Sequence, residues 1–424
     1  MLTKFKKYWE KIGPGIVTGA ADDDPSGVAT YSQVGAKYGF QFLWTAVFTF
    51  PFMAIVQEMC TRIGLVTGKG LANAIRNYCP PYVLYTTTLL LFVANTFNIG
   101  ADLSAVGETT RLLIPSLSAG EIIVIFTAIT LLLQVLVPYK EYARYIKYLS
   151  FTLVVYIIAG LNLDIDWINV FHQTLIPHIT FSKDFIILIG AVLGTSISPY
   201  LFFWQPSQQI EEEREKGREL ELNNNLSAQV VEKNEAIADM RFDVWTGMFF
   251  SNLVMFFIIL VCGAVLFPNG ITNIGTAKDA AQALLPIAGK STYLLFTLGI
   301  LGTGLLGVPV LAGSSAYAIA ETFRFKEGLY NKYREAQAFY LVIIISVLIG
   351  VLISFSGVHP MQVLIYSAVF NGIIAPILLV VIVYLAGREK IMGQWKNTKL
   401  QSFLGWFITA IMSIVGLTTI WFLL

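Results

Sequence analysis

The sequence predicts an all-α polytopic membrane protein from three observations: a high apolar content, a low charge content and long apolar runs. Of the 424 residues, 56% are hydrophobic and 13% are charged, whereas soluble domains have about 45–50% apolar and about 25% charged residues. The excess apolar surface has to face lipid, and a bilayer core of roughly 30 Å needs about 20 apolar residues per helix. Long unbroken apolar runs exclude a β-barrel, so the spans are helices.

We expect eleven membrane-spanning helices in one transmembrane domain, residues 1–424. They are predicted at 13–36, 41–66, 82–106, 119–138, 147–161, 185–205, 243–267, 292–322, 337–357, 361–386 and 401–424. The one long polar insertion, 206–241, is expected to be a cytoplasmic loop. Within it, the mixed-sign run 211–216 predicts a solvated helix.

The distribution of Lys and Arg predicts the orientation of the chain. With a cytoplasmic N-terminus, all but five of the 28 Lys and Arg fall in inside segments, in agreement with the positive-inside rule. The five exceptions are Lys37, Arg111, Lys183, Lys278 and Lys290. Eleven spans then place the C-terminus outside, and we expect a bacterial-type plasma membrane.

Two of the predicted helices carry a proline in mid-span, flanked by Gly, Ser and Thr. Pro25 interrupts the first helix and Pro199 interrupts the sixth. Proline removes a backbone N–H and glycine permits non-helical geometry, so both stretches are expected to unwind. The two spans lie five apart, which is typical of inverted-repeat transporters with a site at the bilayer midplane. The repeats are expected at about 12–161 and 184–386, with 401–424 as an extra helix.

Three consecutive acids, Asp22, Asp23 and Asp24, lie at the first interruption. A charged Asp near the bilayer centre costs about 2.5–3.5 kcal/mol on insertion scales, so such residues usually have a function. Consecutive side chains in a helix point about 100° apart. Asp24 adjoins Pro25 and is the best cation ligand, whereas Asp22 and Asp23 either line an entrance or have structural roles. Asp102 has no local cationic partner and is a candidate for the ion path.

Several other protein classes are excluded or disfavoured. The net charge of +1 gives no sign of a nucleic-acid partner. No His-Glu-x-x-His string of a zinc protease and no P-loop of an ATP-driven pump occurs. Gly100-Ala101-Asp102 lacks the second glycine of an intramembrane aspartyl protease. We expect no enzyme activity and no cofactor.

With these residues considered, the chain resembles the Nramp family of divalent metal transporters over nearly its whole length. The family carries Asp-Pro-Gly-Asn in its first helix and Met-Pro-His in its sixth. The matching segments here are Asp24-Pro25-Ser26-Gly27 and Ser198-Pro199-Tyr200. Further similar segments are Gly68-Lys69-Gly70-Leu71-Ala72, Ala101-Asp102-Leu103 and Ala312-Gly313-Ser314-Ser315 with Glu321. The resemblance implies a LeuT-like fold, with two inverted five-helix repeats plus an eleventh helix and with helices 1 and 6 broken.

The departures from the family pattern bear on the metal. Gly27 replaces the asparagine ligand, and Ser198 replaces the methionine whose thioether favours soft transition metals. The resemblance therefore implies a ligand set rich in oxygen: Asp24, Ser198, Gly27 and the carbonyls near Ala21 and Thr195. Oxygen ligands suit Mg²⁺ and Mn²⁺, and the pattern resembles the Nramp-related magnesium transporter branch (NRMT).

A second departure concerns protons, which the family typically co-transports. Tyr200 stands at the position of the helix-six histidine, and Ala105 replaces the second acid of helix three. Neither side chain titrates near neutral pH, so we expect facilitated uptake without proton coupling. Proton-coupled Mn²⁺/Fe²⁺ symport remains the alternative, because Asp102 is a possible proton site.

A sodium-coupled organic solute carrier with the same fold is a weaker alternative, since three acids at the break would repel a substrate carboxylate. Partners are then a divalent metal ion and the lipid bilayer, and we expect a monomer. Residues expected to line the ion path or to hold metal-bound water are Asp22, Asp23, Gln33, Asp102, Ser196, Tyr200 and Gln362. For Gln33, Ser196 and Gln362, helix–helix hydrogen bonding is an equal expectation.

Overall fold

The computed structural model describes residues 13–137, 153–215, 217, 226–285, 289 and 292–423, and these residues form helices joined by short connections. The first half contains α2 Pro14–Asp22, α3 Pro25–Tyr38, η1 Gly39–Phe42, α4 Leu43–Thr67, α5 Leu71–Tyr78, α6 Pro81–Arg111, α7 Ala119–Leu136, α9 Val154–Leu161 and α10 Trp167–Leu175. The second half contains α11 Lys183–Ser196, α12 Leu201–Glu215, α13 Leu226–Val265, α14 Ala277–Ala281, η3 Gln282–Leu284, α16 Thr292–Phe323, α17 Gln337–Ser354, α18 Pro360–Gly387, α19 Glu389–Met392, η5 Gly393–Trp395 and α20 Lys399–Leu423.

The helices long and apolar enough to cross a membrane agree with the predicted spans. Nine such stretches occur in the described residues, and one of them, Pro25–Thr67, holds both α3 and α4, which are separated only by η1. Every predicted span is thereby matched except the fifth, 147–161. That span lies partly outside the described residues, and its described part is α9.

Both predicted interruptions are present. The first expected span consists of α2 and α3, separated at Asp23–Asp24, and the sixth consists of α11 and α12, separated at 197–200. Pro25 stands just after the first break, and Pro199 lies within the second. Pro25 occupies the first turn of α3, where its missing N–H would have no intrahelical acceptor.

The expected loop 206–241 is shorter than predicted, because α12 continues to Glu215 and α13 begins at Leu226. Glu, Arg, Lys and Ala have high helix propensity, so the charged segment extends both helices instead of forming a coil. The run 211–216 is helical up to Glu215, as predicted, and Lys216 lies outside the described residues. Its face is only partly solvated, since Glu213 is fully buried.

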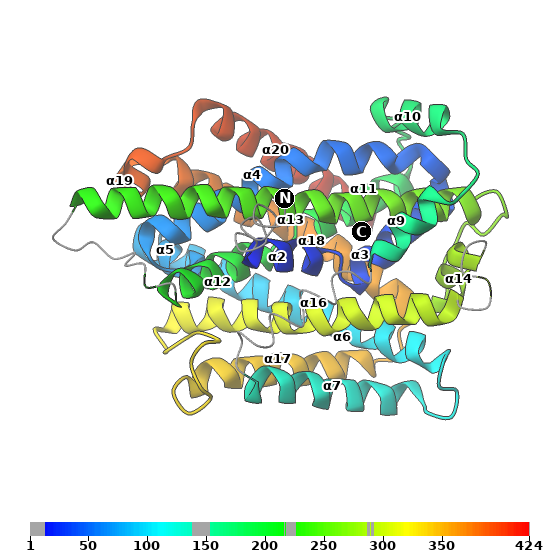
Figure 1. Cartoon of the computed structure of the whole chain (residues 1–424), viewed down its shortest axis with the longest axis horizontal. Coiled ribbons are helices and arrows are strands. Elements are labelled where there is room, and N and C mark those ends of the chain that lie inside the picture. The colour runs from blue at the N-terminus through cyan, green and yellow to red at the C-terminus, as the bar shows by residue number, and fades with distance from the viewer. Residues whose placement is uncertain are drawn as a thin grey trace, which may run out of the picture.

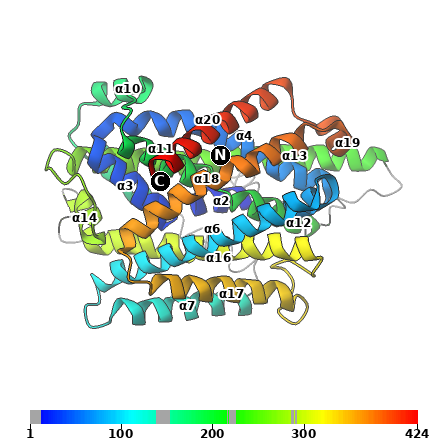
Figure 2. The ribbon, with the colours of Figure 1, turned by 180° about the vertical axis from the view of Figure 1, so that it is seen from behind.

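The broken helices lie inside the bundle. Figure 1 shows α7 and α17 side by side at one edge, with α6 and α16 between that pair and α2 and α12. The view from behind, in Figure 2, shows the same order, with α4 and α20 on the opposite side. The packing of α13 against α2 and α3 places the first break among other helices, and the packing of α11 against α18 and of α12 against α4 and α16 does so for the second.

Backbone-to-backbone packing joins α2 to α13. A Cβ on Gly19 would lie 2.2 Å from the carbonyl oxygen of Gly247, and a Cβ on Gly247 would lie 2.0 Å from that of Gly15. Only glycine permits this approach. The side chain of Asp243 on α13 accepts hydrogen bonds from the N–H groups of Gly13 and Gly15 at 2.9 and 2.6 Å, and thereby satisfies the N-terminus of α2.

Glu58 connects three helices near the predicted cytoplasmic side. Arg62, four residues later on α4, pairs with one carboxylate oxygen of Glu58 at 3.3 Å, and Arg241 of α13 pairs with the same oxygen at 3.0 Å. Trp245 and Gln401 also donate to this carboxylate. A buried acid with this many donors is a structural junction of α4, α13 and α20.

Candidate metal site

The first break positions Asp24 as the N-cap of α3. Its Oδ1 accepts hydrogen bonds from the N–H of Gly27 at 2.9 Å and from the hydroxyl of Ser26 at 2.7 Å. Aspartate is among the preferred N-cap residues because its carboxylate satisfies N–H groups that have no helical partner. The sequence Asp-Pro-Ser-Gly therefore fixes the carboxylate at the point where α2 ends.

The other oxygen of Asp24 faces α6. Its Oδ2 accepts a hydrogen bond from the side-chain amide of Asn98 at 2.7 Å, and the hydroxyl of Ser367 on α18 donates to the Asn98 carbonyl oxygen at 2.6 Å. Asp24 is 2% exposed. Helices α3, α6 and α18 thus hold one buried carboxylate in a fixed orientation, and an ionised carboxylate has about four acceptor positions, so both oxygens retain capacity for a cation.

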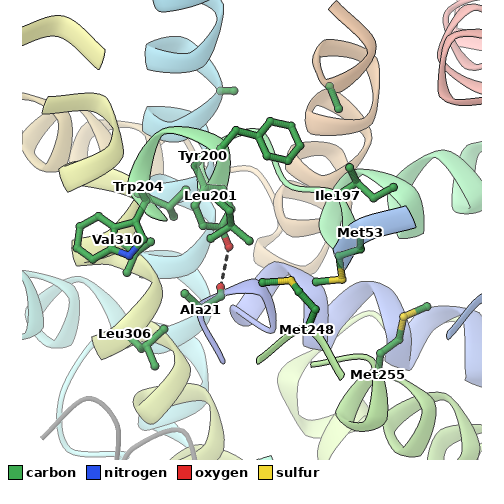
Figure 3. Close-up of a cluster of buried hydrophobic side chains, with 14 of the residues drawn as sticks. Ala21, Met53, Ile197, Tyr200, Leu201, Trp204, Met248, Met255, Leu306 and Val310 are labelled. Atoms are coloured by element: carbon green, nitrogen blue, oxygen red, sulfur yellow. Dashed lines mark hydrogen bonds between the residues drawn. The ribbon is translucent and has the colours of Figure 1, made fainter. Parts of the chain in front are cut away.

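The second break faces the first one directly. The hydroxyl of Tyr200 donates to the carbonyl oxygen of Ala21 at 2.6 Å, as the dashed line in Figure 3 shows. Ser314 on α16 donates to the carbonyl oxygen of Tyr200 at 2.7 Å. The hydroxyl of Ser198 turns back to the carbonyl oxygen of Thr195 at 2.5 Å. Four residues expected at the site, Ala21, Tyr200, Ser198 and Thr195, are therefore brought to the meeting point of the two breaks.

The three consecutive acids point to different neighbours, as their spacing predicted. Asp24 faces α6, whereas Asp22 accepts a hydrogen bond from Ser251 on α13 at 3.0 Å. Asp23 is 1% exposed, and neither of its carboxylate oxygens has a hydrogen-bond partner. In the described part of the chain, no three His, Cys, Asp or Glu side chains converge on one metal position. Backbone carbonyls and hydroxyls would have to complete any coordination shell.

Asp102 is buried next to the same break. It is fully inaccessible to solvent, and both carboxylate oxygens lack a hydrogen-bond partner. A Cβ placed on Gly307 of α16 would lie 3.1 Å from Cβ of Asp24 and 3.5 Å from Oδ2 of Asp102. Gly307 therefore leaves the space into which these two acids project.

The remaining expected residues lie farther from this point. The hydroxyl of Ser196 is 3.3 Å from that of Tyr31 on α3. Gln33 bonds the connection between α13 and α14, donating to the Thr272 carbonyl at 3.1 Å and accepting from the N–H of Ile274 at 2.9 Å. Gln362 is exposed at the start of α18. Gln33 therefore bonds a connection and not another helix, which differs from the helix–helix hydrogen bonding expected as its alternative role. Gln362 is not brought to the breaks.

Sequence reasoning missed several residues at the site: Asn98, Ser367, Ser251 and Tyr31, together with the methionines Met53, Met248 and Met255, which Figure 3 shows near Ala21 and Ile197. Asn98 had a readable signal, since it lies one helical turn before Asp102 and shares its face. Ser251, Ser367 and the methionines are on other helices, and the sequence gives no sign of their proximity.

Two cavities of different size lie toward opposite ends of α16. A cavity of about 10 Å³ lies between Pro25 and Ala29 of α3 and Ala105 and Glu108 of α6. A larger, polar cavity of about 550 Å³ lies at the other end of α16, lined by residues that include Asn73, Glu211, Glu321 and Glu327. Glu321 accepts bonds from the N–H of Asn73 at 2.8 Å and from Ser207 at 3.2 Å. Among the described residues, Glu321 forms no ion pair with the nearby Arg324.

Comparisons with known proteins support this reading of the fold. Residues 15–422 match the family model described as Nramp, natural resistance-associated macrophage protein-like. The divalent metal cation transporter MntH of Yersinia pestis is 24% identical over 413 residues, which cover 96% of this chain and 93% of the relative. MntH of Klebsiella pneumoniae is 23% identical over 402 residues, covering 94% and 91%.

Two solved structures extend the comparison. The Eremococcus coleocola manganese transporter, in complex with an aromatic bis-isothiourea compound, superposes with a TM-score of 0.77 at 19% identity, covering 98% of this chain and 87% of that one. Mhp1, a nucleobase-cation-symport-1 family transporter, superposes with a TM-score of 0.54 at 17% identity, covering 96% and 90%. The predicted LeuT-like fold is therefore confirmed.

Proposed function

Because this chain belongs to the Nramp family, we propose that it carries divalent metal cations across a membrane by alternating access. The observation that supports this most directly is the meeting of two broken helices around the buried carboxylate of Asp24. The relatives in Yersinia pestis and Klebsiella pneumoniae are named divalent metal cation transporters. Unwound backbone is tolerated at membrane depth only where protein or a cavity covers it, and such stretches supply carbonyl ligands.

Within this proposal, the cargo is Mg²⁺, with Mn²⁺ also accepted. The ligand set is Asp24, Ser198 and the carbonyls of Ala21, Gly27 and Thr195, all of them oxygen. The thioethers of Met255 and Met53 accept hydrogen bonds from Ser196 and Asn252 at 3.5 and 2.9 Å, and neither belongs to the proposed ligand set. Hard oxygen ligands favour Mg²⁺ and Mn²⁺ over softer ions.

The proposed mode is facilitated uptake into the cytoplasm by a monomer, with the N-terminus inside and the C-terminus outside. Tyr200 and Ala105 occupy positions where the family has titratable groups, and neither side chain exchanges a proton near neutral pH. The membrane potential contributes about 2.3 kcal/mol per charge per 100 mV, doubled for a divalent ion, which suffices as a driving force.

Uptake into proteoliposomes tests the cargo and the site together. Mg²⁺ and Mn²⁺ should enter liposomes that contain the wild-type chain. Asp24→Asn should reduce the rate of uptake about tenfold or more, because the loss of one charged ligand should cost more than about 1.4 kcal/mol of binding free energy. Asparagine also caps helices well, so α3 should remain intact. Asp164→Asn, the same change at an exposed residue, is the matched control. Unaltered uptake by Asp24→Asn would refute the site.

Proton-coupled symport is the second candidate, and the buried, unpartnered carboxylate of Asp102 favours it. Lumenal pH during Mn²⁺ influx separates the two modes. Uncoupled transport leaves the pH constant when the potential is clamped, whereas acidification that follows metal entry, and that disappears in Asp102→Asn, would establish coupling.

A further inference from the structure

Asp22 and Asp23 form an acidic pair that the Asp24 site does not use. Both are 1% exposed. One oxygen of Asp22 and both oxygens of Asp23 have no hydrogen-bond partner. In the described residues, neither carboxylate belongs to an ion pair. Buried carboxylates in proteins are paired, hydrogen-bonded or bound to a metal ion.

The pair lies on the opposite side of the first break from Asp24. Asp24 has both oxygens engaged by Ser26, Gly27 and Asn98. Asp22 accepts a hydrogen bond from the hydroxyl of Ser251 on α13 at 3.0 Å, and the hydroxyl of Ser198 at the second break also lies beside it. Asp23 interacts electrostatically with Asp22, and Ser251 is also the hydroxyl in its surroundings. The break therefore has one carboxylate facing α6 and two facing α13.

Further oxygen atoms surround the pair. The hydroxyl of Tyr31 lies close enough to both acids for their charges to act on it, and it is 3.3 Å from the hydroxyl of Ser196 at the end of α11. Carboxylates and hydroxyls of this kind are the groups that hard divalent cations bind, directly or through retained water. When both are ionised, the two carboxylates carry two negative charges without a protein counter-charge, which matches one doubly charged ion.

We propose that Asp22, Asp23 and Ser251 hold a second divalent cation across the first break from the Asp24 position. The inference rests on the proposed function in one respect, namely that the ion is of the class that the chain transports. The two positions would lie on opposite faces of one unwound segment. An ion that arrives at one position would then repel the ion already bound at the other.

Counting bound Mn²⁺ tests the proposal. The purified full chain in detergent is dialysed to equilibrium against Mn²⁺, and the metal-to-protein ratio is measured by elemental analysis. The wild type and the exposed-site control Asp164→Asn should each bind two ions, and Asp23→Asn one. Asparagine has the shape of a neutral aspartic acid. A wild type that binds one ion, or an Asp23→Asn protein that still binds two, would therefore overturn the proposal.

Ser251→Ala keeps both charges and tests the site without a change of charge. The second ion should bind about 3- to 10-fold more weakly, the effect of one lost hydrogen-bonding oxygen, while the ratio at saturation stays at two. Equal affinity in this variant would also overturn the site as stated. If Asp23→Asn does not fold, as judged by size exclusion, this variant and Asp22→Asn carry the test.

The proposed function and this inference fail in different ways. A chain that binds two Mn²⁺ ions but does not move them into liposomes would refute transport and leave the second position in place. A chain that transports Mn²⁺ but binds a single ion, lost only in Asp24→Asn, would refute the second position alone.

Discussion

Asp24 caps α3 with one carboxylate oxygen and faces α6 with the other. The two contacts orient the carboxylate before any ion arrives, so little side-chain entropy would be lost on binding. Asn98 is the residue that couples this carboxylate to α6 and, through Ser367, to α18. Asn98 is not itself expected to bind the metal, but it determines the orientation of the Asp24 carboxylate.

Removal of the Asn98 amide tests this orientation. Asn98→Ala should slow Mn²⁺ uptake about tenfold, mainly by raising KM, because Asp24 would keep its charge and lose its second contact. Asn269→Ala, at an exposed residue whose side chain donates to the Val265 carbonyl, is the control for the same substitution. Uptake by Asn98→Ala equal to that of Asn269→Ala would exclude the orienting role.

A substitution at Ser198 tests how the ligand atom at the second break determines metal selectivity. Ser198→Met restores a thioether at the second break, so Cd²⁺ uptake should rise and Mg²⁺ uptake should fall. Ser198→Ala is the control, since it removes the hydroxyl without adding sulfur and should reduce uptake of both ions. The ratio of Cd²⁺ to Mg²⁺ uptake in proteoliposomes is the readout. A ratio that changes equally in both variants would contradict the role given to the sulfur.

At the scale of the element, the important contact is the glycine packing between α2 and α13. Gly15, Gly19 and Gly247 let the two backbones touch, and Asp243 holds the N-terminus of α2. The same packing brings Ser251, one turn beyond Gly247, next to Asp22 at the end of α2. The position of the acidic pair thus depends on the absence of side chains elsewhere along these helices.

A methyl group at this contact should separate the helices. Gly19→Ala places a Cβ 2.2 Å from the Gly247 carbonyl oxygen, and overpacking of this kind costs typically 1–3 kcal/mol. We expect a thermal transition lower by several degrees and slower metal uptake. Gly387→Ala is the control, because nothing lies within 4 Å of its Cβ position. Equal transition temperatures for the two variants would show that α2 moves without cost.

At the scale of the whole molecule, acids at the predicted cytoplasmic side tie distant segments together. Glu321 of α16 binds the start of α5, and Glu211 of α12 accepts from the hydroxyl of Tyr317 at 2.7 Å and from the N–H of Tyr330 at 3.2 Å. Glu327 lies in the connection between α16 and α17, beside both acids. Burial, reinforced by the charges of Glu321 and Glu211, raises the pKa of Glu327 to about 9.

This raised pKa predicts a pH-dependent stability. The folded state binds the Glu327 proton more tightly than the unfolded state, so ionisation lowers stability as pH rises from about 4.5 toward about 9. Glu327→Gln should therefore raise the thermal transition of the full chain at pH 8 and leave it unchanged at pH 4. Glu389→Gln is the control of opposite sign, because Lys396 lowers the pKa of the exposed Glu389 carboxyl. If Glu327→Gln raised the thermal transition temperature equally at both pH values, the raised pKa of Glu327 would not be the cause.

Much of the fold followed from hydrophobic runs and proline positions, because lipid requires continuous helices and Pro25 and Pro199 prevent them. The elements at both breaks agree with the prediction, as does the separation of Asp24 from Asp22 in direction. The loop 206–241 was predicted too long, since helix propensity carries α12 and α13 beyond the apolar residues. Gln362 illustrates the limit at the site, because position in a span does not specify which neighbour a side chain faces.

The sequence by itself therefore determined the membrane class, the two interruptions and the acid that caps the first one. These features depend on local chemistry: apolar length, the missing N–H of proline and the preference of aspartate for an N-cap. Only the tertiary structure decided that Asn98 holds Asp24, that Tyr200 bridges to Ala21 and that Ser251 faces Asp22. Such contacts join residues more than seventy positions apart, and the packing of helix faces, which no local pattern specifies, brings them together.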